Sequence, residues 1–382
     1  MRRKANRLNN VKEYYFSIKL REVRELIAQG KPIINLGIGS PDLAPPKEVI
    51  DAITNASKQT QNHGYQSYQG VPELRQSIAD FYKKYYTVAD LDINSEILPL
   101  MGSKEGILHI SMAYLNAGDE VLIPNPGYPT YTSVTNLVEA KPVFYDLKED
   151  NNWFPDFESL EKSDLTKVKI MWVNYPHMPT GATPTDELFE KLIAFGKKHN
   201  ILIVNDNPYS FVLNDDPKSI LAYRGAKDVA IELNSLSKTF NMAGWRVGMV
   251  LGNKENINNI LQVKSNMDSG MYFGIQQGAI AALKLSNGWF KKMNTVYEDR
   301  RKIVWKICDV LNCVYDTNSV GLFVWAKVPK GKSAIKLTDD LLYNKDVFIT
   351  PGMIFGSNGD DYIRFSLCVK EDKIKEVLKR IL

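Results

Sequence analysis

The sequence predicts an α/β protein in which helices cover both faces of a mostly parallel sheet. Over roughly residues 45–280, short apolar runs rich in branched side chains alternate with longer segments of helical periodicity. The runs are almost continuously apolar, which is typical of strands buried on both faces of a parallel sheet. The chain of 382 residues is 44% hydrophobic, and this is enough to fill a sizeable core.

Six candidate strands and four candidate helices make up this alternation. The strand candidates are Glu96–Met101, Glu120–Pro124, Val168–Asn174, Ile201–Asp206, Val229–Asn234 and Arg246–Leu251. The helix candidates between them are Pro72–Tyr85, Lys104–Leu115, Asp186–His199 and Gln276–Leu285. Together they predict a large α/β domain over residues 45–280.

The two ends of the chain predict a smaller α+β domain. The start holds one helix and one short strand, about Ser17–Gly30 and Ile33–Leu36. After residue 280 come two amphipathic stretches around Trp289–Leu311 and then short strands at Gly321–Val328, Asp346–Thr350 and Tyr362–Ser366. No Gly/Ser- or Pro-rich linker separates the parts. We therefore expect residues 1–44 and 281–382 to form the small domain together.

Composition excludes several classes of protein. The balance of 48 Lys+Arg against 44 Asp+Glu gives a net charge of only +4, so we expect no nucleic-acid partner. The apolar runs are far shorter than the ~20 residues of a membrane span, and no apolar region follows the basic start, so we expect neither a membrane protein nor a secretory signal. The three cysteines, Cys308, Cys313 and Cys368, are too few and scattered for a disulfide framework or a zinc site. They indicate reduced thiols in a cytoplasmic protein without a metal.

The segment from Ser235 to Gly248 carries the strongest chemical signal. It follows an apolar strand, so Lys238 is expected at the C-terminal end of that strand, where open α/β sheets bind ligands. Ser235 and Ser237 flank the lysine, and Arg246 follows it by eight residues. Hydroxyl groups together with an arginine suit a phosphate dianion. From these residues alone, the alternative is a surface lysine on a polar loop.

The spacing of this segment resembles the lysine motif of the class I/II aminotransferases, which are pyridoxal-phosphate (PLP) enzymes of fold type I. The resemblance extends over almost the whole chain, from Leu36 to Leu367. It implies a mostly parallel seven-stranded central sheet and PLP as the cofactor. It also implies that Lys238 forms the Schiff base with PLP and that Ser235, Ser237 and Arg246 surround its phosphate.

A second candidate phosphate contact is the small-residue turn Gly102-Ser103-Lys104. It lies between a predicted strand and a predicted helix, so its backbone N–H groups would face an anion at the helix N-terminus. The alternative from the residues alone is an ordinary turn. The resemblance implies that Gly102, Ser103 and Lys104 cradle the cofactor phosphate.

Four further residues are candidates for contacts with the cofactor. Asp206 ends a very apolar run, and a carboxylate there requires a cationic or donor partner, unless it caps a helix before Pro208. The resemblance implies that Asp206 pairs with the pyridine nitrogen and that Tyr209 donates to the phenolic oxygen. It also implies that Tyr128, in a Pro/Gly turn where packing is the alternative role, stacks on the ring. Tyr65 matches the family tyrosine that reaches the phosphate of the neighbouring subunit, which implies a homodimer with shared active sites.

Two segments resemble a clamp for the substrate carboxylate. Near the N-terminus, Gly39 would supply a backbone amide, and near the C-terminus, Arg364 lies inside an apolar strand. An arginine in that position requires a bidentate anion, or an ion pair with a structural acid as the alternative. Both segments fall in the small domain, which suggests that this domain closes on the substrate.

The sequence departs from the family at one position. The family has Asn-Pro-Thr-Gly, whose Asn donates to the phenolic oxygen, whereas Met178 precedes Pro179 here and has no group to donate. Asn174, at the end of the preceding strand, is the candidate that partly substitutes. We hypothesise that the imine holds its proton more tightly than in relatives with Asn, so its pKa is higher. His177 is expected to have a structural role, because the lysine already supplies the acid–base group.

The resemblance implies an aminotransferase that moves an amino group from an L-amino acid to a 2-oxo acid by ping-pong kinetics, with Lys238 as the proton carrier. The run Lys264–Gly270 and the start Leu36–Gly39 look like the subgroup of LL-diaminopimelate and aspartate aminotransferases. Acidic or diamino-diacid donors are therefore expected, with Lys104 able to meet a distal carboxylate, while aromatic donors remain an alternative. The main competing function is a C–S lyase of the same fold. A PLP-binding transcription regulator is disfavoured, because no basic module precedes the motifs.

Overall fold

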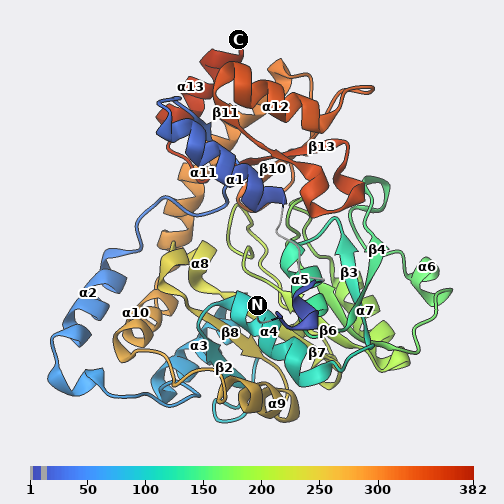
Figure 1. The fold of residues 1–382 in the computed structure, drawn as a ribbon. Helices are drawn as coiled ribbons and strands as arrows, with labels where there is room; N and C mark the ends of the chain where they lie inside the picture. Colours follow the sequence, from blue (N-terminus) through green and yellow to red (C-terminus); the bar gives the residue numbers. More distant parts are fainter. Residues whose placement is uncertain (1–2, 10–14) are drawn as a thin grey trace.

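The computed structural model describes residues 3–9 and 15–382, so residues 1–2 and 10–14 of the expected small domain lie outside the described part. A seven-stranded sheet forms the centre of the lower body in Figure 1, with the order β2-β8-β7-β6-β5-β3-β4. Only β8 runs against its neighbours, so the mostly parallel seven-stranded sheet is confirmed. The strands are β2 (Ile97–Leu100), β3 (Glu120–Asn125), β4 (Lys141–Asp146), β5 (Val168–Val173), β6 (Leu202–Asp206), β7 (Ala230–Ser235) and β8 (Gly248–Leu251).

Two strands differ from expectation. The sequence pattern did not indicate β4, because this edge strand is largely exposed and carries Pro142, which an edge position tolerates. The expected strand Arg246–Leu251 begins two residues late, at Gly248, because Arg246 has a left-handed φ of 58°. A strand cannot include that conformation.

Helices cover both faces of the sheet, as expected. On one face, α3 (Pro72–Tyr86), α7 (Asp186–His199) and α10 (Phe273–Leu283) contribute to one apolar cluster, and on the other, α4 (Ser103–Tyr114), α5 (Pro129–Leu137) and α9 (Lys254–Lys264) contribute to another. Strand β5 supplies Met171 and Val173 to the first cluster and Ile170 and Trp172 to the second. This alternation explains why residues 170–173 of the strand are all apolar.

Helix α7 illustrates how the sequence sets its own ends. Thr185 caps the N-terminus by accepting a hydrogen bond from the backbone N–H of Leu188 at 3.1 Å. Acidic residues occupy the first turn and basic residues the last turn, as the helix dipole favours. Asn200 ends the helix at a φ of 54°.

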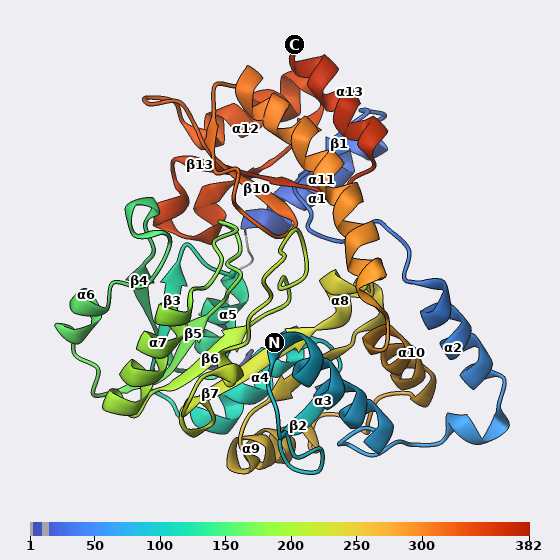
Figure 2. The same cartoon turned by 180° about the vertical axis from the view of Figure 1, so that it is seen from behind.

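The upper body combines helix α1 and strand β1 with the C-terminal part of the chain, whereas the N-terminal turn Asn6–Asn9 lies beside α5 on the lower body (Figures 1 and 2). Its antiparallel sheet has the order β12-β13-β10-β9, and β1 pairs in parallel with β11. The strands are β1 (Ile34–Asn35), β9 (Val314–Tyr315), β10 (Phe323–Lys327), β11 (Val347–Phe348), β12 (Thr350–Pro351) and β13 (Tyr362–Ser366). The helices are α1 (Tyr15–Ala28), α11 (Asn287–Val310), α12 (Ala334–Lys345) and α13 (Glu371–Ile381). The two stretches expected around Trp289–Leu311 are one continuous helix, and the expected strand Asp346–Thr350 is divided between β11 and β12.

Helix α1 packs on the upper body, because Val23 contacts Leu342 and Phe348. A separate apolar cluster runs through α11, β10, β13 and α13. The domain boundaries at residues 44/45 and 280/281 stay a prediction. The remaining helices are α2 (Lys47–Ser57), α6 (Phe157–Glu161) and α8 (Leu236–Thr239), with short 3-10 turns at Asn6–Asn9, Thr60–His63, Glu149–Asn151, Ile220–Ala222, Ala226–Asp228, Ala243–Trp245, Gly352–Phe355 and Ser357–Gly359.

In the described ranges, none of the helices combines the length and the apolar character that crossing a membrane requires. All three cysteines are buried and unpaired.

Candidate active site

A cavity of about 670 Å³ lies where the C-terminal ends of the parallel strands meet the upper body. Such strand ends are the usual ligand site of open α/β sheets. The lower body contributes residues that follow β2, β3, β5, β6 and β7, and the upper body contributes residues from β10, β13 and α1. Most of the predicted site residues line this cavity: Gly39, Ser103, Lys104, Tyr128, Asn174, Asp206, Tyr209, Ser235, Ser237, Lys238, Arg246 and Arg364.

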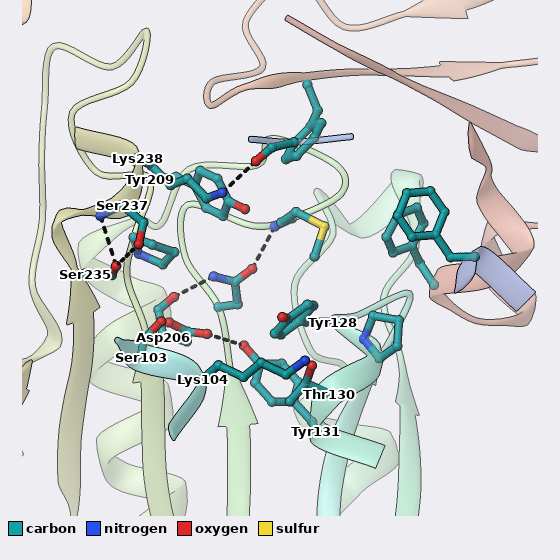
Figure 3. Close-up of a pocket in the computed structure, with 18 of the residues that line it drawn as sticks. Ser103, Lys104, Tyr128, Thr130, Tyr131, Asp206, Tyr209, Ser235, Ser237 and Lys238 are labelled. Carbon is teal, nitrogen blue, oxygen red and sulfur yellow. Dashed lines mark hydrogen bonds between the residues drawn. The ribbon is translucent and has the colours of Figure 1, made fainter. Parts of the chain in front are cut away.

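Lys238 lies in the short helix α8, directly after β7. The side chain of Ser235 caps this helix by accepting a hydrogen bond from the backbone N–H of Ser237 at 3.0 Å. The Lys238 Nζ donates to the carbonyl of Gly39 at 2.6 Å (Figure 3). Burial lowers the pKa of the Lys238 amine, and the charges of Arg364 and Arg246 lower it further. A larger neutral fraction makes this amine a better nucleophile and base.

The anion pocket forms beside α8 at the N-terminus of α4. Gly102 has a φ of 93°, and a Cβ built on it would lie 2.0 Å from Nη2 of Arg246. Only glycine therefore lets the turn approach the guanidinium. The hydroxyls of Ser235 and Ser237 are joined by a 2.7 Å hydrogen bond, and the first residue of α4 is Ser103. Arginine, hydroxyl groups and a helix N-terminus together suit a phosphate.

Asp206, the last residue of β6, lies in the cavity with one oxygen unsatisfied. Its Oδ2 accepts a hydrogen bond from the Tyr131 hydroxyl at 2.9 Å, whereas its buried Oδ1 has no partner among the described residues. Burial raises the pKa of Asp206 to about 7. A buried carboxylate with an orphaned oxygen requires a cationic donor, and a protonated ring nitrogen fits this requirement. Tyr131 was missed by the sequence analysis, although its position three residues after Tyr128 places it in the same helical turn.

Both polar atoms of the Asn174 side-chain amide form hydrogen bonds with the backbone. Its Nδ2 donates to the carbonyl of Asp206, and its Oδ1 accepts from the backbone N–H of Met178 at 2.8 Å. One hydrogen of the Nδ2 group remains for a further acceptor. Its predicted contact with the cofactor stays a prediction.

Tyr128 and Tyr209 lie on the cavity wall (Figure 3). Tyr128 directly precedes α5 and packs edge-on against Tyr131 at 5.6 Å between ring centroids. Tyr209 packs edge-on against Phe323 at 6.1 Å. Burial raises the pKa of Tyr209, so its hydroxyl keeps its proton and can donate it in a hydrogen bond.

The two clamp segments meet in the cavity although they lie at opposite ends of the chain. Arg364 Nη2 donates to the carbonyl of Gly37 at 2.8 Å, and Nη1 lies 3.3 Å from Sδ of Met178. The guanidinium stacks over Phe323, and its Cζ atom lies 3.9 Å from the centroid of the ring. The same ring excludes a side chain at Gly39, since a Cβ there would lie 2.2 Å from its edge. Burial lowers the pKa of Arg364 to about 10, so it stays charged at neutral pH.

Other predicted positions lie outside the wall of the cavity. Tyr65 does not line the cavity of its own chain, and 93% of its surface is exposed. His177 is buried, with Nδ1 2.8 Å from Oγ1 of Thr180, and burial lowers its pKa to about 3. A neutral, buried imidazole fits the structural role expected for His177.

One group of side chains has the composition of a cation site. Ligand atoms of Glu105, His109 and Asp268 lie within 4.8 Å of one another. However, Nζ of Lys264 lies 2.7 Å from Oδ2 of Asp268 and already supplies a positive charge there. The absence of a metal from the chemistry stays a prediction.

The residues present fit the cofactor that the resemblance implies. Ser103, Ser235, Ser237 and Arg246 would hold its phosphate, Asp206 its ring nitrogen, and Lys238 its aldehyde carbon. The upper-body residues Tyr15, Phe16 and Phe355 also line the cavity and were not foreseen from the sequence. Their apolar spacing is that of ordinary core residues, so no sequence signal distinguished them.

Comparisons with known proteins show which family and which solved structures the chain is similar to. A family model described as aminotransferase class I and II matches residues 31–381. The LL-diaminopimelate aminotransferase of Aquifex aeolicus is 40% identical over 99% of this chain and 98% of its own. Among solved structures, apo-BacF from Bacillus subtilis has a TM-score of 0.95 and 35% identity, covering 100% of this chain and 98% of that one. An aminotransferase from Staphylococcus aureus has a TM-score of 0.89 and 32% identity, covering 99% and 98% of the two chains.

Proposed function

Because this chain belongs to the class I and II aminotransferases, we propose that its amino donors are acidic or diamino-diacid L-amino acids. The chain is a pyridoxal-phosphate-dependent enzyme that moves an amino group from an L-amino acid to a 2-oxo acid. The observation that carries the proposed donor class is the side chain of Lys104, since its predicted contact with the cofactor phosphate uses the backbone N–H of the turn. Its side chain lies on the cavity wall and forms no hydrogen bond or ion pair with any described residue.

Each cavity cation has a different task in this proposal. Arg246 binds the cofactor phosphate, and Arg364 with the Gly39 amide holds the substrate α-carboxylate through a bidentate pair. Lys238 binds the cofactor. Lys104 then remains for a second, distal carboxylate, which acidic and diamino-diacid donors have and aromatic donors lack. The Aquifex aeolicus relative is named LL-diaminopimelate aminotransferase, which supports the same class.

The chain's own residues orient the substrate and move one proton. When bound, pyridoxal phosphate supplies an aldehyde carbon for condensation and a protonated ring that withdraws electrons. Asp206 provides the negative charge that keeps the ring nitrogen protonated. The clamp of Arg364 and Gly39 fixes the Cα–H bond of the substrate, and the Lys238 amine removes that proton and later returns it. Burial lowers the pKa of Lys238 and so increases the fraction of the neutral amine that this task requires.

The donor class is tested by mixing the PLP-loaded enzyme with single amino acids and following the absorbance of the cofactor. Aspartate, glutamate and LL-diaminopimelate are expected to convert the cofactor fastest. The Lys104→Met variant is expected to lose about 10- to 100-fold in kcat/KM for these donors and little for alanine, because one charged hydrogen bond is removed. A faster reaction with aromatic donors in the unmodified enzyme would refute the proposed class. Release of pyruvate and ammonia from cystathionine without a 2-oxo acid would favour the C–S lyase instead.

We also infer a homodimer with shared active sites. Tyr65 is an almost fully exposed aromatic residue, and the neighbouring turn carries Met267, which is 55% exposed. The two segments pack tightly, since a Cβ on Gly270 would lie 2.4 Å from the carbonyl oxygen of Gln66. A fixed, exposed aromatic segment outside its own cavity suits a contact with a second copy of the chain.

Subunit exchange tests the shared site. The Tyr65→Ala and Lys238→Ala variants are each expected to be impaired as pure proteins. A mixed dimer would contain one complete site, with Lys238 from one chain and Tyr65 from the other, so mixing is expected to restore activity. If Tyr65 served its own chain, mixing would restore nothing.

We place the enzyme in the cytoplasm, where the three unpaired thiols stay reduced.

A further inference from the structure

A buried arginine on α11 connects the two segments of the carboxylate clamp. Nη1 of Arg300 donates to Oδ1 of Asp42 at 2.6 Å and to the carbonyl of Leu367 at 2.9 Å. Nη2 donates to Oδ2 of Asp42 at 2.9 Å. Only 3% of Arg300 is exposed. The guanidinium thus binds one carboxylate through two parallel hydrogen bonds and a backbone carbonyl through a third.

Both partners of Arg300 lie three residues from a member of the clamp. Asp42 follows Gly39 in the loop after β1, and Leu367 follows Arg364 at the end of β13. The two segments also touch directly, since the backbone N–H of Ser366 donates to the carbonyl of Leu36 at 2.7 Å. Arg300 adds the one ion pair through which α11 holds the loop of Gly39, as far as the described residues show.

The energetics favour a positional role over a stabilising one. Burying a guanidinium is costly, and an apolar side chain of similar volume fills such a position at least as well. Arg300 also leaves its Nε without a partner in the described part of the chain, so the desolvation is not fully compensated. What an apolar residue cannot supply is orientation, because two parallel N–H···O bonds to one carboxylate permit a single geometry.

We propose that Arg300 is a positioning residue of the substrate carboxylate site, which holds the Gly39 loop against the Arg364 strand without touching the substrate. This inference rests on the proposed function, in which Gly39 and Arg364 bind the α-carboxylate. Since both the amino acid and the 2-oxo acid carry that carboxylate, Arg300 governs the binding of both. It acts equally on the ground state and the transition state, so it affects KM more than kcat.

The next residue on α11 provides a matched control. Arg301 donates to the carbonyl of Ser319 at 2.8 Å and pairs with Glu298 of its own helix. It belongs to the same helix and has the same side chain, but it contacts neither segment of the clamp. A loss that is due only to removing a partly buried arginine from α11 would appear in both variants.

The experiment measures both half-reactions of the PLP-loaded enzyme for Arg300→Lys, Asp42→Asn, Arg301→Lys and Arg364→Lys. Arg300→Lys is expected to raise KM for the amino donor and for the 2-oxo acid by about tenfold each, with kcat within about twofold, because a bidentate charged contact is lost. Asp42→Asn is expected to raise both KM values by the same factor. The double variant Arg300→Lys/Asp42→Asn is expected to raise them no further than the stronger of the two single variants, because both substitutions remove the same contact. The absorbance of the cofactor and its pH titration stay unchanged, while Arg301→Lys leaves both KM values unaltered.

Two results would overturn the inference. If Arg364→Lys raises KM but Arg300→Lys and Asp42→Asn do not, Arg300 has only a structural role, and the proposed function survives. If Arg364→Lys itself leaves both KM values unchanged, the clamp is wrong and the inference fails with it. Should Arg300→Lys not fold, Asp42→Asn alone decides, because it keeps the bond from Arg300 to Leu367 and removes only the ion pair.

Discussion

The carboxyl group of Asp206 gives a sharp test of the site in the protein from which the cofactor has been removed. This side chain is 5% exposed, its Oδ1 has no partner among the described residues, and its one donor is the Tyr131 hydroxyl. Burial raises its pKa to about 7 from the ordinary value of 3.8. The perturbation is Asp206→Asn, which keeps the size of the side chain and removes its ionisation.

The raised pKa determines the sign and size of the effect on stability. Between pH 4 and 7 the folded state keeps a proton that the unfolded state has lost, so stability is highest below pH 4 and falls as the pH rises toward 7. At 1.36 kcal/mol for each pH unit, the difference between 3.8 and about 7 corresponds to about 4 kcal/mol in full. Between pH 5 and pH 8, the loss is about 2 to 3 kcal/mol.

Urea unfolding of the cofactor-free protein measures this loss at a fixed protein concentration. From pH 5 to pH 8, the free energy of unfolding of the Asp206→Asn variant is expected to rise by about 2 to 3 kcal/mol relative to that of the unmodified chain. Adding pyridoxal phosphate is expected to abolish the difference, because a ring cation lowers the pKa of Asp206. Tyr131→Phe removes the one donor to Asp206 that the described residues supply, and it is expected to enlarge the loss of stability between pH 5 and pH 8, because the pKa of Asp206 then rises further. Equal pH dependence of the unmodified chain and Asp206→Asn would refute the idea of a desolvated, uncompensated carboxyl group.

Three further predictions concern the cavity. Lys238→Ala is expected to abolish both turnover and the absorbance band of the lysine-bound cofactor, and full activity in this variant would contradict the assignment. Met178→Asn introduces a donor beside the cofactor and is expected to lower the imine pKa in a spectral pH titration, so an unchanged or higher pKa would reject the hypothesis. Gly39→Ala drives a methyl group into the ring of Phe323 and is expected to raise KM for donor and acceptor by about tenfold or more, as steady-state kinetics would detect.

The large sheet could be predicted because its strands are coded locally. Residues such as Ile170 to Val173 are apolar at every position, and this pattern is specific to a strand with helices on both faces. The edge strand β4 escaped prediction for the opposite reason, since its exposed residues carry no such pattern. The sequence also did not predict that α11 is one continuous helix. An amphipathic pattern does not show whether a helix continues from one body of the protein into the other.

The place of many candidate site residues in the cavity could likewise be predicted, because it depends on backbone position. Lys238, Gly102 and Asp206 each lie at the end of a strand or a few residues beyond it, and the C-terminal ends of parallel strands lie along one edge of the sheet. Contacts between side chains could not be identified in this way. The hydrogen bond from Tyr131 to Asp206 and the stacking of Arg364 on Phe323 depend on rotamers and on packing across elements.

The sequence by itself determined six of the seven strands of the large sheet, the cofactor family and the residues at the strand ends, because these follow from local patterns and from motifs a few residues long. Only the tertiary structure decided how the two ends of the chain combine. It brought Arg364 within hydrogen-bond distance of Gly37 and placed Arg300 between Asp42 and Leu367. These pairs lie 327, 258 and 67 residues apart, and no local pattern specifies such a contact, since it forms only when packing of the whole chain closes the intervening loops.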